Sequence, residues 1–187
     1  MFEEFGLTHV EQKICGEFTT FKALNETLGE LYGEVSKASI DSEEEGAVLY
    51  MVEVFKDEKK RANTLTLAKL KTLEYRLFRK IREKLKTYVS RGRGDAKVQK
   101  ATERKFLNEA KGLTRSFPAF NKLSYYSDIL LLSMNFIKAN PGFNVEQIHN
   151  NFVNFITCMR ECLAKKIQPS IKMIFTPDSI KEIIQKA

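Results

Sequence analysis

The feature that most constrains how this chain can fold is the repetition of apolar residues at helical spacing, in a sequence with few helix breakers. Only nine Gly and four Pro occur among its 187 residues, so long regular elements are favoured. The clearest stripe runs from Leu67 to Tyr88, where apolar side chains recur every three or four residues. Such spacing gathers them on one face of an α-helix. We therefore predict an all-α fold, a helical bundle of about six to seven helices with long, elongated N-terminal helices.

Further helices are predicted from the same spacing and from capping residues. Asp95 and Asn144 are good N-terminal caps, and Gly112 is predicted to stop the helix that follows Asp95. The sequence shows no alternation long enough for a sheet, and residues 171–175 are the one short strand candidate. The further helices are expected over residues 8–35, 44–55, 96–111, 124–139 and 145–168, with a short last helix after Pro177 that carries Ile180, Ile183 and Ile184.

Charge is distributed very unevenly along the chain. Residues 1–58 hold 14 acidic and 4 basic residues, a balance of −10, whereas residues 59–115 hold 19 basic and 5 acidic residues, a balance of +14. Residues 116–187 add 8 basic and 5 acidic residues, and the three balances give the net charge of +7. We therefore divide the chain into a charged helical region, 1–115, and a more apolar helical region, 116–187, which we expect to share one core.

The basic residues of the middle block recur in phase on two predicted helix faces that an arginine-containing loop joins. Such faces suit a phosphate backbone, because each Lys or Arg that contacts a phosphate releases counterions. The leading hypothesis is a non-enzymatic, nucleic-acid-binding helical subunit that works within a larger assembly and binds DNA or RNA. The expected contact residues are Lys69, Arg76, Arg79, Lys80, Lys84, Lys86, Arg91, Arg93, Lys97, Lys100, Arg104 and Lys111.

Two alternatives account for the same charge. The basic face could pair with the chain's own acidic helices, or with those of another subunit, because the −10 and +14 blocks are adjacent in sequence. The chain could also be a protein–protein adaptor or inhibitor that uses its charged surface or its apolar C-terminal helices.

No catalytic or metal-binding signature is complete. Glu146 and His149 match the Glu-x-x-His unit of di-iron bundles, but such a site needs a second unit and two more Glu residues. Cys158 and Cys162 lie one helical turn apart, and a zinc site would need two further ligands. We expect core cysteines, no cofactor and no enzymatic activity.

The remaining sequence features concern location. Three cysteines are an odd and sparse set, which favours a reducing compartment. The N-terminus has neither the basic nor the apolar region of a signal peptide, and the densest apolar run, residues 129–137, is too short to span a bilayer. We expect a soluble intracellular protein of the cytoplasm or nucleus, with a protein partner or a second copy of itself.

Overall fold

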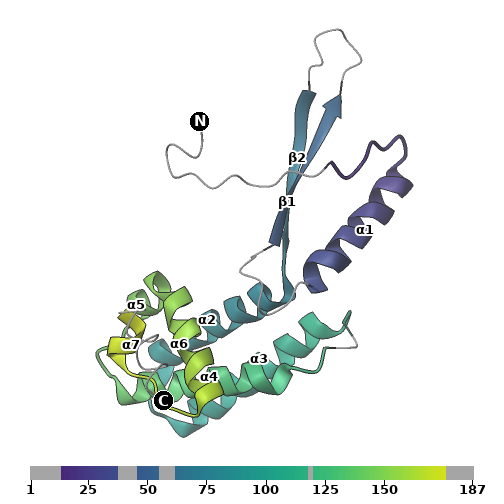
Figure 1. Cartoon of the computed structure of the whole chain (residues 1–187). Helices are drawn as coiled ribbons and strands as arrows, with labels where there is room; N and C mark the ends of the chain where they lie inside the picture. The colour runs from purple at the N-terminus through teal and green to yellow at the C-terminus, as the bar shows by residue number, and fades with distance from the viewer. Residues whose placement is uncertain (1–13, 38–45, 55–61, 118–119, 176–187) are drawn as a thin grey trace, which may run out of the picture.

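The computed structural model describes residues 14–37, 46–54, 62–117 and 120–175 (Figure 1). These residues form mainly α-helix, so the predicted helical bundle is confirmed. One antiparallel pair of strands was not expected from the sequence. The elements in chain order are α1 (Phe21–Lys37), β1 (Gly46–Val54), β2 (Ala62–Lys71), α2 (Leu73–Gly92), α3 (Ala96–Thr114), α4 (Leu123–Ala139), α5 (Val145–Asn150), α6 (Phe152–Lys165) and α7 (Ile171–Phe175).

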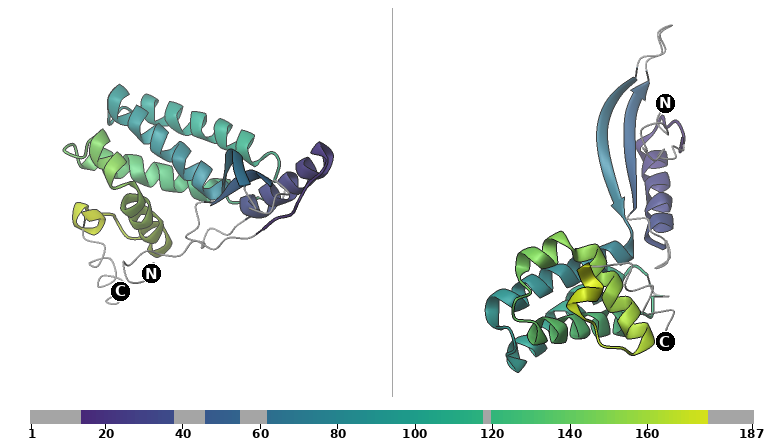
Figure 2. Two further views of the ribbon diagram at one scale, coloured as in Figure 1. Left: turned by 90° about the horizontal axis from the view of Figure 1, so that it is seen from above. Right: turned by 60° about the vertical axis from the view of Figure 1, so that its left-hand side comes forward.

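The molecule has two parts, a bundle made of α2–α7 and an arm made of α1, β1 and β2 (Figures 1 and 2). The arm projects from one end of α2, and the chain passes from arm to bundle once, at Thr72. Among the described residues, every buried side chain lies between Thr72 and Ile174. The hydrophobic core therefore belongs to the bundle, and the arm side chains whose burial is described contribute none of its fully buried residues.

The core forms where the apolar stripes of the helices meet. α2 buries Leu77, Ile81 and Leu85 completely, and these are members of the stripe that predicted the helix. α4 contributes more buried residues than any other described helix, in agreement with its apolar sequence. α3 adds Phe106 and Ala110 from its inner face. Since these two residues face inward, the opposite face of α3 is left for solvent.

Two predicted caps are confirmed and position the helices that follow them. The Asp95 carboxylate accepts hydrogen bonds from the backbone N–H groups of Lys97 (2.6 Å) and Val98 (3.3 Å), and α3 begins directly after it. Asn144 and Gln147 form a reciprocal capping box at the start of α5. Such bonds satisfy backbone N–H groups that have no partner within the helix.

The helix predicted over residues 44–55 is wrong, because residues 46–54 are strand β1. It pairs with β2 in an antiparallel hairpin in which Tyr50 lies opposite Leu67. Apolar residues on both sides of β1 satisfy helical spacing as well as strand alternation, so spacing alone was ambiguous. Valine, tyrosine and threonine are enriched in strands, and this preference is the signal that was overlooked.

The start of α2 was also predicted too early. The Thr72 hydroxyl accepts a hydrogen bond from the Tyr75 backbone N–H at 3.1 Å, so the helix begins at Leu73 rather than at Leu67. Residues 67–71 belong to β2, and Lys69 therefore lies on a strand and not on the predicted helix.

Other boundaries differ in smaller ways. α1 begins at Phe21, and residues 14–20 are not helical, whereas residues 1–13 lie outside the described part. α3 continues through Gly112 to Thr114, and the helix predicted over 145–168 is divided into α5 and α6 at Asn151. Residues 171–175, the one strand candidate, form helix α7. The short last helix predicted after Pro177 lies outside the described residues.

α1 and the hairpin pack only partly against each other. Between Phe21 and Val35 no side chain of α1 is buried, and one face of the hairpin remains open to solvent. Val48, Tyr50 and Leu67 on that face are 48%, 66% and 54% exposed.

In the described part of the chain, no helix has the length and apolarity needed to cross a membrane.

Candidate nucleic-acid interface

The strongest candidate surface is the solvent-facing side of α3. Lys97, Lys100, Arg104 and Lys111 all lie exposed on it, at the helical phase that the sequence predicted. Among the described residues, none of these four forms an ion pair or a side-chain hydrogen bond. The row from Lys97 to Lys111 is about 21 Å long at 1.5 Å per residue. We call these four residues the α3 stripe.

Sequence reasoning missed two exposed cations on α3 and directly after it. Lys105 follows Arg104 and is exposed, and Arg115 is exposed one turn after Lys111. Arg115 could have been found from helical phase, since residues four apart share a face. Lys105 is turned by about 100° from Arg104 around the helix axis and lines the groove between α2 and α3. The two cations extend the positive surface across α3 and beyond its last turn.

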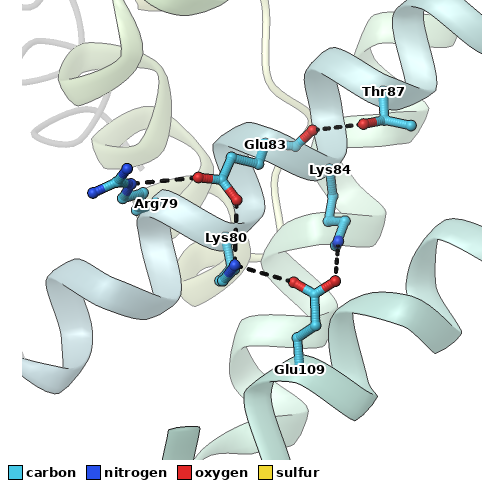
Figure 3. Close-up of polar contacts among 6 residues, drawn as sticks. All are labelled: Arg79, Lys80, Glu83, Lys84, Thr87 and Glu109. Carbon is cyan, nitrogen blue, oxygen red and sulfur yellow. Dashed lines mark hydrogen bonds and ion pairs between the residues drawn. The ribbon is translucent and has the colours of Figure 1, made fainter. Parts of the chain in front are cut away.

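α2 differs from α3, because several of its predicted contact residues are already paired with carboxylates (Figure 3). Arg79 Nε lies 3.3 Å from Glu83 Oε1, and Lys80 Nζ lies 3.4 Å from Glu83 Oε2. These are pairs within one helix. They offset part of the positive charge that the sequence assigned to α2.

Glu109 of α3 forms the second set of pairs and joins the two helices (Figure 3). It accepts a short hydrogen bond from Lys84 through one oxygen, and its other oxygen lies 3.4 Å from Lys80 Nζ, an ion pair at the outer limit of hydrogen bonding. The hydrogen bond from Lys84 lowers the pKa of Glu109, and the charges of Lys84 and Lys80 add to this effect. Glu109 is therefore ionised at neutral pH.

Three further predicted residues have structural partners. Arg76 donates to the Tyr32 hydroxyl at 2.5 Å, and Lys86 Nζ lies 3.3 Å from His149 Nδ1. Arg93 donates to the Phe143 carbonyl at 2.7 Å and also to the Pro141 carbonyl. Arg93 therefore bonds the loop that joins α2 and α3 to the segment between α4 and α5, so this loop is not a free arginine loop.

Lys69 and Arg91 are exposed, but they lie in different places. Lys69 is on the open face of the hairpin, opposite Val48 in the strand register. Arg91 lies in the last turn of α2, where it lines a groove between α2 and α3. The twelve predicted residues thus do not form one surface. The α3 stripe and Arg91 lie on the helix pair α2 and α3, whereas Lys69 lies on the arm.

The acidic helix of the arm does not cover the α3 stripe. Glu26, Glu30 and Glu34 are exposed on α1, and the ion pair formed there in the described part joins Glu26 to Lys22 of the same helix. α1 meets the bundle through Tyr32, whose ring lies 6.5 Å from that of Phe117. Pairing between the acidic and basic faces is therefore not observed among these residues.

The cysteine and histidine candidates lie outside this surface. The Sγ atoms of Cys158 and Cys162 are 3.9 Å apart inside the core. Burial, reinforced by Cys162, raises the pKa of the Cys158 thiol to about 12, so this thiol is protonated. In the described ranges, no three His, Cys, Asp or Glu side chains are grouped in a way that could hold a metal ion.

No protein-family model matches this chain, and neither does any curated protein or any solved structure.

Proposed function

We propose that this protein binds nucleic acid through the α3 stripe. One observation carries the proposal: four cations are aligned on a solvent-facing helix side without a carboxylate partner among the described residues. A row of this kind can follow a phosphate backbone, and it would contribute affinity that depends on salt and little on sequence. The protein would act as a binding subunit and not as an enzyme.

A charge reversal within the stripe tests the proposal. We expect Lys100→Glu/Arg104→Glu to reduce affinity for a short single-stranded oligonucleotide by at least about tenfold, because two attractive contacts become repulsive. Fluorescence anisotropy over a salt series would measure this. Unchanged affinity of the double variant would exclude the α3 stripe as the binding surface.

The matched control reverses two other exposed lysines. Lys165→Glu/Lys172→Glu changes the net charge by the same amount, on α6 and α7, which pack on α4, α5 and each other. We expect this variant to keep most of the affinity. An equal loss in both variants would mean that binding follows net charge and not the stripe.

A second candidate function, protein–protein interaction, is favoured by the open face of the hairpin. Tyr50, Leu67 and Val48 are about half exposed or more there, next to each other in the strand register. Contiguous exposed apolar patches larger than a few hundred Å² commonly mark interaction sites. The simplest partner is a second copy of this chain, so sedimentation should reveal a dimer that Tyr50→Ser/Leu67→Ser converts to a monomer. A monomeric wild-type protein would contradict this.

A further inference from the structure

Between α2 and α3 lies a groove that the sequence did not predict. Its volume is about 520 Å³, within the range of small-ligand sites in proteins. Residues of both helices line it, and its apolar part comes from Val98 and Ala101. The full lining is Lys84, Thr87, Arg91, Val98, Ala101, Thr102, Lys105, Asn108 and Glu109.

The charges of the groove do not cancel. Lys84 and Glu109 are bonded to each other, whereas Arg91 and Lys105 form no ion pair among the described residues. Three cations and one carboxylate leave an excess of two positive charges in a concave surface. Such a surface concentrates the electrostatic field and attracts anions more strongly than a flat one does.

The positions of the two unpaired cations suit a phosphate group. Arg91 extends from α2 and Lys105 from α3, so an anion between the helices is reached from both sides. The planar guanidinium can hold two phosphate oxygens at once, while a lysine ammonium acts as a point charge. The exposed amide of Asn108 adds N–H donors on the same side.

We propose that this groove is a phosphate-binding site, with Arg91 and Lys105 as its ligating residues and Glu109 limiting its positive charge. The site takes the phosphate of a nucleic-acid backbone or of a free polyphosphate. If the phosphate comes from a nucleic-acid backbone, this inference rests on the proposed nucleic-acid function. If it comes from a free polyphosphate, the inference is independent of that function.

The experiment removes the two cations without reversing them. Arg91→Gln/Lys105→Gln is titrated with a short single-stranded oligonucleotide and separately with inorganic tripolyphosphate, next to wild type and the control Lys165→Gln/Lys172→Gln. We expect Arg91→Gln/Lys105→Gln to bind both probes at least about tenfold more weakly, since two charge-assisted hydrogen bonds are lost. Both residues are exposed, so the fold should be retained, and circular dichroism checks this.

A gain of affinity gives a second, independent readout. Glu109→Gln keeps the shape of the side chain but releases the positive charge of Lys84 into the groove. We expect it to bind tripolyphosphate severalfold more tightly than wild type, because the excess charge rises from two to three. Unchanged or weaker binding would overturn the assigned role of Glu109.

The two probes separate this inference from the proposed function. If Arg91→Gln/Lys105→Gln binds both probes like wild type while Lys100→Glu/Arg104→Glu loses the oligonucleotide, the groove is not a site and the proposed function stands. If wild type binds tripolyphosphate through Arg91 and Lys105 but does not bind the oligonucleotide, the groove is a polyphosphate site and the proposed function is wrong. If wild type binds neither probe, both are wrong.

Discussion

At the scale of single residues, Glu109 shows why a count of basic residues overstates the charge that a protein offers to a ligand. Its carboxylate holds Lys84 and also lies close to Lys80, so two cations of α2 are partly neutralised (Figure 3). The partner is 25 residues away from Lys84 and comes from another helix. Only the packing of α2 on α3 brings these side chains together.

This pairing predicts a pH dependence of stability. The folded-state pKa of Glu109 lies below its ordinary value of 4.5, mainly because of the hydrogen bond from Lys84. The ion pairs therefore stabilise the fold above about pH 4.5, and the stabilisation is lost as the pH falls through the lower folded-state pKa. We expect Glu109→Gln to cost about 1 kcal/mol or less near pH 7, because partly exposed pairs contribute little.

Urea unfolding of wild type and Glu109→Gln near pH 7 and near pH 3 measures this effect. The difference in unfolding free energy should shrink toward the lower pH, because the stabilisation from ionised Glu109 decreases as the pH falls below the ordinary pKa of the group. A difference that stays constant with pH would show that the variant disturbs packing and not the ion pairs.

The cysteines predict a pattern of thiol reactivity. Cys158 and Cys162 are buried, and burial raises the pKa of both thiols, whereas Cys15 is exposed. Because the thiolate is the reactive form, a disulfide reagent should modify Cys15 rapidly in the native protein and the other two only after unfolding. Mass spectrometry counts the labels. Rapid native labelling of Cys158 would mean that the α6 core opens readily.

At the scale of elements, Gly112 gives a test that separates sequence from structure. If Gly112 ended the helix in a left-handed conformation, an alanine there would destabilise the protein. Instead, α3 continues through Gly112 to Thr114, and the Cβ that alanine would add meets no atom within 4 Å. We therefore expect Gly112→Ala to raise the unfolding free energy by about 0.5–1 kcal/mol. Gly94 is the control, because its φ of +90° makes alanine strained there. Thermal unfolding of both variants measures these changes in stability. Destabilisation by Gly112→Ala would contradict a helix that ends at Thr114.

The elements that the sequence predicted well have one apolar face and a clear cap. α3 meets this condition, with Asp95 before it, whereas α4 is apolar on most sides and is followed by the Asn140-Pro141-Gly142 turn. The hairpin does not meet this condition, since Ala47, Leu49 and Met51 alternate with equally apolar neighbours. The α3 stripe could be predicted from helical phase alone. The groove could not, because it depends on which side chains of α2 meet α3.

At the scale of the whole molecule, the location of the core predicts that the bundle folds without the arm. A chain that begins at Thr72 keeps every described buried residue and loses the Arg76–Tyr32 hydrogen bond and the Tyr32–Phe117 ring contact. We expect cooperative thermal unfolding with Tm lowered by about 4 °C, the effect of about 1 kcal/mol in a domain of this size. The absence of a cooperative transition would show that the arm is needed for folding.

The same truncation predicts a change in binding. Residues 1–71 hold 14 acidic and 9 basic residues, a balance of −5, so their removal raises the net charge from +7 to +12. If the α3 stripe binds nucleic acid, the truncated protein should bind the oligonucleotide more tightly at low salt, and the gain should fade as salt rises. Weaker binding after truncation would place part of the binding surface on the arm.

The single crossing between arm and bundle at Thr72 also has a genetic consequence. All described arm residues precede this point, and the bundle follows it as one uninterrupted stretch. One recombination junction near codon 72 can therefore add, delete or exchange the arm without opening the bundle. Genes in which the same bundle follows a different leader segment, or none, are the natural variants that this architecture permits.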